Sequence, residues 1–180
     1  VGFNADLPQT YDGEQNIHAP YTNLQYNLTD RLSGVLGLRY ENIRQDVSFR
    51  TQLDRRGRTN SLTRNEVLPS LLLKYLLKEN QNLRMSLGRT YTLPQFKERA
   101  FFIYSDVNAS KQGNPHLYPS TDYNFDLRWE AFPQASKLLS ATVFGKYIQN
   151  PINEVVLSPS PKYISSVTLG YYGPAYGLEL

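Results

Sequence analysis

Apolar and polar residues alternate one by one along much of the chain. In the clearest stretch, 120–132, every second residue is apolar: Tyr123, Phe125, Leu127, Trp129 and Ala131. The same period occurs in residues 22–28, 32–41, 71–77, 83–88 and 139–147. A period of two is typical of β-strands that have one apolar and one polar face. The pattern therefore predicts an all-β chain with about seven antiparallel strands.

The connections between these strands alternate in length. The predicted short turns are Thr29–Arg31, Lys78–Asn82 and Pro133–Lys137. The predicted long loops are Thr51–Glu66, Leu93–Pro119 and Pro151–Lys162. Short periplasmic turns that alternate with longer extracellular loops are typical of up-and-down transmembrane β-barrels. We therefore expect residues 1–180 to be one part of a single outer-membrane β-barrel domain.

Aromatic residues on the apolar face fall into two groups along the predicted strands. The group near the short turns contains Tyr26, Tyr75 and Trp129. The group nine or ten residues away from those turns contains Tyr40, Tyr91, Tyr123 and Tyr147. Nine residues of a strand tilted by about 40° rise roughly 23 Å, close to the apolar band of about 25 Å on such barrels. These residues are predicted to form two membrane girdles.

Composition fits strands with two different faces better than it fits membrane helices. Apolar residues make up 40% of the chain and 14 residues are tyrosines, yet the mean hydropathy is −0.50. The longest apolar stretch, Leu71–Leu77, is interrupted by Lys74 and is far shorter than the roughly 20 residues of a membrane helix. A soluble β-sandwich is the structural alternative, but its strands average about 5 to 6 residues.

Charge and cysteine content exclude other classes of function. The net charge is +3, but the basic residues are scattered and no RNA-binding or DNA-binding motif accompanies them, so we expect no nucleic-acid partner. The chain contains no cysteine, so it has neither a disulfide nor a thiolate metal site. Its first residue is Val1 with no apolar leader after it, so we expect the sequence to be an excerpt.

Several segments in one order resemble the barrel of TonB-dependent outer-membrane receptors. Leu68–Ser70 resembles the family's "hP-S" strand entry, and Arg89–Phe96 resembles its "R-P-x-F" strand exit. Gln112–Ser120 is similar to "G-N-P-x-L-x-P-E", although Ser120 replaces the usual Glu. Phe144–Ile152 is similar to "Y-x-x-I-x-N-x-I", and the ending Tyr176–Leu180 is similar to "Y-G-x-E-x". The segment 27–42 also resembles a hairpin of this family.

This resemblance implies the C-terminal β-barrel portion of a receptor of about 22 strands, which a separate N-terminal plug domain fills. It also implies energy-coupled import of a scarce nutrient of the siderophore, vitamin or oligosaccharide class. The implied partners are outer-membrane lipid, the nutrient ligand, the TonB complex through the absent plug region, and a surface lipoprotein. Two alternatives stay open: a passive porin-like or structural outer-membrane barrel, and a soluble glycan-binding β-sandwich.

Ligand-binding residues are predicted in two of the long loops. The first loop is rich in arginine, whose planar guanidinium group suits carboxylates and phosphates: Arg55, Arg56, Arg58 and Arg64. The second loop carries aromatic residues that suit an apolar binding rim: Phe96, Phe101, Phe102, Tyr104 and Tyr118. The alternatives are a solvated arginine loop and aromatic packing within the second loop itself.

No catalytic, cofactor or metal site is predicted. His18 and His116 are the only histidines, and neither has a His, Cys or paired acid at metal-ligand spacing. The sequence contains no phosphate-binding loop and no nucleophile elbow. The charged residues of the polar face are expected to line the lumen of the barrel: Arg39, Glu41, Lys74, Arg84, Asp126, Arg128, Glu130 and Lys146.

The facing of the strand at 120–132 can be tested with two neighbouring substitutions. Leu127→Arg should cost about 2–4 kcal/mol, because it places a charge on the lipid face of the strand. Arg128→Ala should be tolerated, because its side chain points to the lumen. The measurement is the amount of folded receptor in the outer membrane, and equal amounts of both variants would contradict the assigned facing.

Overall fold

The computed structural model describes residues 10–50, 56–101, 103–105, 110–134, 136–159, 162–168 and 172–180. Apart from one short helix, α1 (Phe96–Arg99), its regular elements are strands. The strands of the larger sheet are β1 (Thr10–His18), β2 (Tyr21–Asn27), β3 (Leu32–Arg50), β4 (Arg58–Lys78), β5 (Gln81–Thr92), β8 (Ser120–Gln134), β9 (Lys137–Gln149) and β12 (Tyr172–Glu179). In the described residues, no helix is long and apolar enough to cross a membrane.

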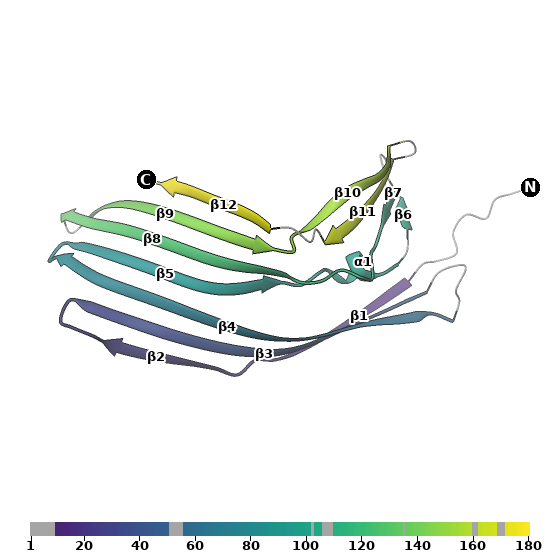
Figure 1. Cartoon of the computed structure of the whole chain (residues 1–180), viewed down its shortest axis with the longest axis horizontal. Coiled ribbons are helices and arrows are strands. Elements are labelled where there is room, and N and C mark those ends of the chain that lie inside the picture. The colour runs from purple at the N-terminus through teal and green to yellow at the C-terminus, as the bar shows by residue number, and fades with distance from the viewer. Residues whose placement is uncertain are drawn as a thin grey trace, which may run out of the picture.

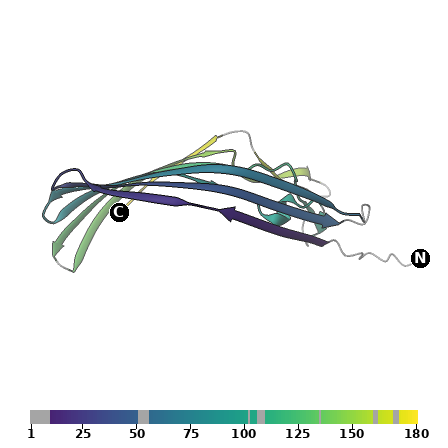
Figure 2. The same ribbon diagram turned by 90° about the horizontal axis from the view of Figure 1, so that it is seen from below.

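The larger sheet is antiparallel and its strands follow the order β1-β3-β4-β5-β8-β9-β12 (Figure 1). β2 also pairs with β3, along the half that β1 does not occupy. Ala19 and Pro20 separate β1 from β2, and proline has no amide hydrogen to donate to a strand ladder. β1 and β2 therefore lie end to end at one position beside β3 (Figure 2), so the eight strands of the larger sheet occupy seven positions, whereas about seven strands were predicted for the chain.

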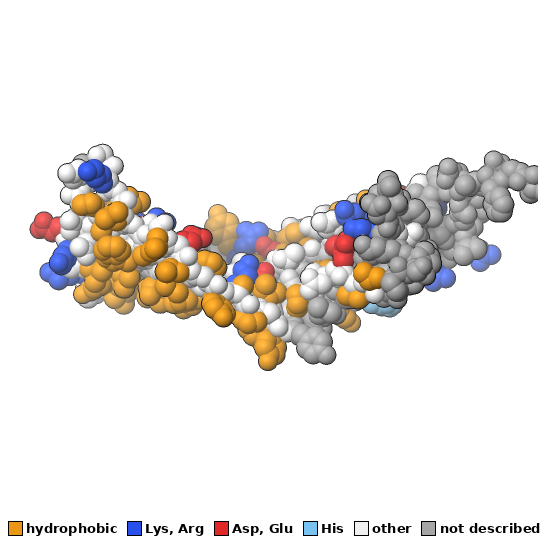
Figure 3. Space-filling view, turned by 90° about the horizontal axis from the view of Figure 1, so that it is seen from above, with side chains coloured by type: hydrophobic (Ala, Val, Ile, Leu, Met, Phe, Trp, Pro, Cys, Tyr) orange, Lys and Arg blue, Asp and Glu red, His pale blue; other side chains and the backbone are white. Residues whose placement is uncertain are grey.

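The two faces of this sheet differ in chemistry along its whole width. One row of directly paired residues crosses the apolar face: Leu24, Leu36, Leu71, Leu87, Phe125, Gly145 and Tyr176. A row on the polar face contains Asn27, Ser33, Lys74, Arg84, Arg128, Thr142 and Glu179. Leu24 is 64% exposed and Leu36 is 55% exposed, so no described residue covers this part of the apolar face. Figure 3 shows hydrophobic side chains gathered along one side of the molecule.

The polar face is held together by ion pairs and hydrogen bonds between strands. Arg84 Nε lies 2.9 Å from Glu130 Oε2, and Ser86 Oγ donates to Asp126 at 2.9 Å. Arg128 Nε approaches the other oxygen of Glu130 at 3.2 Å. Carboxylates of this face thus pair with arginine or hydroxyl groups of the same or a neighbouring strand, which lowers the cost of carrying charge on a lumen wall.

The predicted loop Thr51–Glu66 is wrong in extent, because β3 continues to Arg50 and β4 begins at Arg58. Polar pairs hold this extension together: Asn42 Nδ2 donates to Asn65 at 2.7 Å, and the hydroxyls of Ser48 and Thr59 lie 2.8 Å apart. On the opposite face of this extension, Ile43 and Val47 are fully buried and Phe49 is 7% exposed. Apolar and polar residues therefore alternate in β3 beyond residue 41, where the predicted strand ended, and only Gln45 interrupts the apolar row.

The other two predicted loops also contain regular structure. Leu93–Pro119 holds α1, β6 (Ile103–Ser105) and β7 (Ser110–Gln112). Pro151–Lys162 is mostly β10 (Ile152–Pro159), which pairs with β11 (Lys162–Thr168). The four strands form a second sheet in the order β10-β11-β7-β6, with β11 and β7 parallel. Lys111 Nζ lies 2.7 Å from Glu154 across this sheet. Two loops that are distant in sequence therefore form one unit.

The larger sheet divides between β4 and β5 at the loop end. The pairing of these strands stops at Ser70 and Gly88, whereas β3 and β4 stay paired as far as Phe49 and Arg58. In the described part of the chain, the remaining residues of β4 have no partner in β5. Figure 1 shows the two strands separating at that end. The sheet therefore divides into a β1-β3-β4 branch and a β5-β8-β9-β12 branch.

Arg89 joins the two branches just beyond the last backbone pair. Its Nη1 donates to the carbonyl of Val67 at 2.6 Å, and its Nη2 lies 2.6 Å from Glu66 Oε2. The Glu66 side chain is only 2% exposed and also accepts from Arg64 Nε at 2.9 Å. One side chain thus replaces backbone pairing where the strands diverge.

Arg89→Met should lower the free energy of unfolding of the complete barrel by about 1–3 kcal/mol, because it leaves a buried carboxylate and a carbonyl short of donors. Arg44→Met is the matched control, since Arg44 is 64% exposed in its pair with Asp46 and exposed pairs contribute little. The measurement is urea unfolding in lipid vesicles. Equal losses for the two variants would contradict the proposed bridge.

Candidate functional site

The segment after β5 folds back over the polar-face side of the β1-β3-β4 branch and begins with α1. Gln95 caps the helix, and its backbone N–H donates to Glu98 Oε2 at 2.8 Å. Such a capping box satisfies amide groups that a short helix would leave unpaired. The residues that follow α1 return to the larger sheet at Ser120. The segment therefore forms an inner wall beside β1 and β3.

A small apolar cluster holds α1 against the sheet. Val47 and Ala100 are fully buried and Phe49 is 7% exposed, and Phe96 packs against these three residues. A Cβ atom at Gly13 would lie 2.5 Å from Cγ of Phe96. The missing side chain at Gly13 therefore makes room for the Phe96 ring between α1 and β1.

The paired parts of β3 and β4 beyond Asn42 and Asn65 are called the extended hairpin. Arg99, at the end of α1, connects this helix to both strands of the extended hairpin. Its side chain is buried, and its Nη1 donates to the Gln45 side chain at 2.8 Å and to the Gln45 carbonyl at 3.2 Å. Its Nη2 donates to Asn60 Oδ1 at 3.0 Å. Gln45 in turn donates to the Pro94 carbonyl at 3.0 Å, and Asn60 donates to the Pro115 carbonyl at 2.7 Å. Arg99 is thus the centre of a network that holds both ends of the segment.

Neighbouring groups and burial shift the pKa values of Asp46 and Arg99. A hydrogen bond from Ser61 lowers the pKa of the Asp46 carboxyl, and Arg44 and Arg99 lower this pKa further. Burial lowers the pKa of the Arg99 guanidinium, and the nearby Asp46 charge opposes this effect. Because an arginine titrates far above neutral pH, both groups are charged at neutral pH.

Gly113 lets the segment close on itself. A Cβ atom there would lie 2.0 Å from the carbonyl oxygen of Ala100 and 2.9 Å from that of Lys97. The next residue, Asn114, donates its backbone N–H to the carbonyl of Glu98 at 2.5 Å and accepts from the backbone of His116 at 2.9 Å. Only a residue without a side chain fits at position 113.

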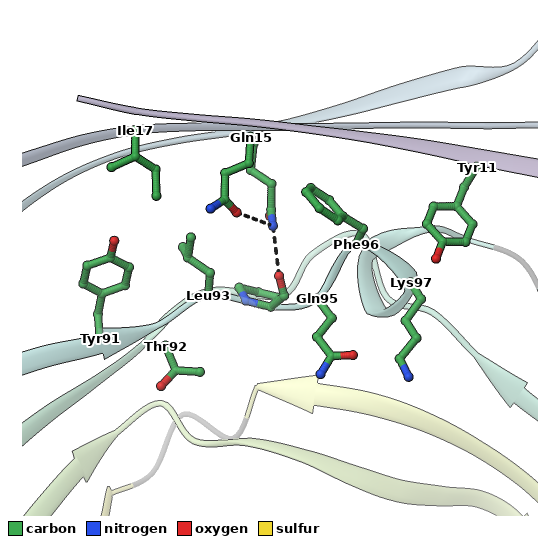
Figure 4. A pocket seen from close by; sticks show the side chains of 11 residues that line it. Tyr11, Gln15, Ile17, Tyr91, Thr92, Leu93, Gln95, Phe96 and Lys97 are labelled. Atoms are coloured by element: carbon green, nitrogen blue, oxygen red, sulfur yellow. Dashed lines mark hydrogen bonds between the residues drawn. The ribbon is translucent and has the colours of Figure 1, made fainter. Parts of the chain in front are cut away.

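A cavity of about 740 Å³ lies between this inner wall and β1. Its lining is Tyr11, Gln15, Ile17, Gln45, Tyr91, Thr92, Leu93, Pro94, Gln95, Phe96 and Lys97. Figure 4 shows Phe96 pointing from α1 toward β1, and Ile17 pointing from β1 toward the end of β5. The lining combines aromatic and apolar surface with three amides and one cation, which suits a small-molecule pocket.

The structure brings few of the predicted ligand-binding residues together. Among those of them that the structure describes, only Phe96 lines the cavity. Phe101 is 50% exposed and Tyr118 is 61% exposed, and their part in an apolar binding rim stays a prediction. The side chains of Phe102 and Tyr104 lie outside the described residues.

The arginines of the predicted first loop are not gathered at the cavity. Arg58 and Arg64 lie on β4, and Arg56 lies in the turn before it. Arg64 pairs with Glu66. Arg55 lies outside the described residues. Their role in binding an anionic ligand stays a prediction.

Sequence reasoning missed most of the cavity lining. Tyr11, Gln15 and Ile17 come from β1, which the alternation did not reveal, and Gln45 comes from a part of β3 that was predicted as strand only up to residue 41. These residues are distant from the aromatic loop in sequence and meet it only through the fold. Pro94 and Phe96 line the cavity and lie in the segment 89–96 that resembles the receptor family, so this resemblance was the sequence signal that could have pointed to the cavity.

Six of the seven predicted girdle residues lie on the apolar face. Tyr26, Tyr40, Tyr75, Tyr123, Tyr147 and Trp129 lie at positions of that face. Tyr123 and Tyr147 have ring centroids 6.3 Å apart, and Tyr147 stacks on Tyr172 at 5.5 Å. Tyr172, which the sequence analysis did not include, extends this aromatic row to β12.

Tyr91 departs from the predicted girdle. Its hydroxyl donates to Glu41, which also pairs with Arg39 on the polar face, and its side chain lines the cavity. The cause is the divergence of β5 from β4 beyond Gly88, which turns the end of β5 toward the β3 side chains. We therefore assign Tyr91 to the inner wall.

Metal binding has no support in the described residues, which contain no group of three His, Cys, Asp or Glu side chains able to hold an ion. His18 lies at the end of β1 and His116 lies in the segment before β8.

The family model described as "TonB dependent receptor-like, beta-barrel" matches residues 1–180. The chain belongs to the TonB-dependent receptor β-barrel family. This membership fits the seven-position sheet with one apolar and one polar face. No curated protein sequence is found to match the chain.

Solved receptors share the fold of this family member at low sequence identity. One is a double mutant of the Serratia marcescens hemophore receptor HasR in complex with its hemophore HasA and heme, with a TM-score of 0.73, 16% identity and coverage of 92% of this chain and 31% of that chain. Another is the siderophore receptor PirA from Pseudomonas aeruginosa, with a TM-score of 0.61, 14% identity and coverage of 93% and 39%.

A third is a mutant of the ferric enterobactin receptor PfeA from Pseudomonas aeruginosa in complex with enterobactin, with a TM-score of 0.55, 13% identity and coverage of 94% of this chain and 33% of that chain. The chain thus spans about a third of the length of these receptors. The likeness establishes the fold of a barrel segment.

Gly113→Ala should open the inner wall, because the added methyl group meets backbone atoms that cannot move independently. We expect a loss of about 1–3 kcal/mol in local stability and faster trypsin cleavage after Lys97 and Lys111 in outer-membrane preparations. Gly88→Ala is the control, since a Cβ atom there has nothing within 4 Å. Equal cleavage rates in the two variants would contradict the assigned role of Gly113.

Proposed function

We propose that this chain is a wall segment of an outer-membrane receptor that imports a scarce nutrient by TonB-dependent, energy-coupled transport. The observation that carries the proposal is the family match over the whole chain, together with an uncovered apolar row across every strand position of the sheet. In lipid such a row needs no further partner. The proposed location is the bacterial outer membrane, and the plug and TonB contacts belong to the rest of the receptor.

The cavity beside α1 supports a contribution of this segment to nutrient binding. It opens at the loop end of the sheet, where a barrel receives ligands from outside the cell. Its lining holds one cation, Lys97, and no carboxylate. Rings of Tyr11, Tyr91 and Phe96 offer flat apolar surface, and amides of Gln15 and Gln95 offer polar groups. We propose a ligand that has ring-shaped apolar faces.

The test uses the complete receptor in living cells and four probes: haem, ferric enterobactin, cobalamin and a maltooligosaccharide. Uptake of one probe should be lost when TonB is deleted, while surface binding of that probe persists. Uptake that continues without TonB would instead favour the passive porin-like alternative. Partition of the complete protein into buffer in place of detergent would favour the soluble sandwich.

A further inference from the structure

The inner wall beside the cavity is held to β3 and β4 by two sets of side-chain contacts: the apolar cluster of Phe96 and Ala100 with Val47 and Phe49, and the hydrogen bonds around Arg99. Residues 94 and 115 are both tied to the hairpin, but through Gln45 and Asn60, which are themselves the acceptors of Arg99. No backbone ladder links α1 to β3 or β4 among the described elements. The position of α1 therefore depends on side-chain contacts.

Burial of the charged Arg99 side chain opposes folding unless all of its donors are paired. Its side chain is 1% exposed, and its Nε has no hydrogen-bond partner among the described residues. A buried charge with an incomplete set of partners is often no more stable than an apolar residue of the same volume. An arginine in this place is better explained by the geometry that its planar, forked donors impose.

The contacts of Arg99 determine the position of the two α1 residues that line the cavity. Phe96 and Lys97 lie one turn or less before Arg99 in a helix of four residues. The Phe96 ring sits over Gly13 of β1 and faces the cavity that Gln15 and Ile17 line from the opposite side. If α1 turned or withdrew, one whole wall of the cavity would change shape.

We propose that Arg99 is a positioning residue for ligand binding: by joining Gln45 of β3 to Asn60 of β4, it holds α1 so that Phe96 and Lys97 form one wall of the cavity. The inference rests on the proposed function of the cavity. Arg99 itself does not contact the ligand. Its substitution therefore changes the cavity through α1 while leaving the strands of the barrel in place.

The position of α1 can be measured without a ligand, because the chain contains no cysteine. A Cβ atom at Gly13 lies 2.5 Å from Phe96 Cγ, so cysteines at positions 13 and 96 fall within disulfide range. The double variant Gly13→Cys/Phe96→Cys, in the complete receptor with any cysteine outside residues 1–180 replaced by serine, should form a disulfide rapidly on mild oxidation. With Arg99→Met added, we expect the rate to fall about tenfold, and Arg99→Lys should restore only part of it.

The control pair is Asn42→Cys/Asn65→Cys, which joins β3 to β4 where the two amides are hydrogen-bonded. Its disulfide should form equally fast with and without Arg99→Met, because its rate depends on the pairing of β3 with β4 and not on the position of α1. Equal rates for the 13–96 pair in both backgrounds would overturn the proposal. A parallel loss in the control pair would also overturn it, because Arg99 would then support the whole hairpin.

The consequence for binding is measured with whichever of haem or ferric enterobactin the complete receptor takes up. Arg99→Met should raise the Michaelis constant for uptake about tenfold, with unchanged maximal rate and unchanged receptor amount at the surface. An unchanged Michaelis constant would overturn the positioning role. If the receptor takes up cobalamin or the maltooligosaccharide instead, the same measurement uses that probe. Uptake of none of the four probes would count against the proposed function, while the disulfide rates would still decide whether Arg99 positions α1.

Discussion

The absence of water in the hydrocarbon core of a membrane is the constraint on which this structure depends. Each backbone N–H and C=O in lipid must find a partner inside the protein, and seven strand positions joined by ladders meet that need. Between the short turns and the tyrosine row, β5 pairs with β8 without a break, and β8 pairs with β9 in one register from Ala131 to Thr121. Side chains then only have to be apolar on one face and paired on the other.

Beyond the tyrosine row, water can satisfy the backbone, and the sheet is free to divide. β4 and β5 part after Ser70 and Gly88, and Arg89 bridges the first gap. The diverging end of β5 carries Tyr91 inward and delivers α1 to the inner side of the hairpin. The cavity thus exists because backbone pairing stops where the membrane stops requiring it.

The parts that the sequence predicted are those that the membrane constrains. Alternation identified the strand at 120–132 and the short turns, because a lipid-facing row must be apolar at every second residue. It did not identify the hairpin beyond residue 41, because Asn, Ser and Thr pairs replace apolar residues on one face and Gln45 interrupts the apolar row on the other. The site was harder still: Gln45 and Asn60 meet Arg99 from 54 and 39 residues away, and no local pattern encodes such contacts. Phe96, inside a recognisable segment, was the exception.

The parallel pairing of β7 with β11 links the two long connections of the second sheet. Segments that share a ladder cannot change independently, since a register shift in one removes the hydrogen bonds of the other. Lys111 and Glu154 add a charge match to that link. Evolution of the outer surface in this part of the barrel would thus proceed by paired changes in both connections, and the length of each is set by its neighbour as much as by any ligand.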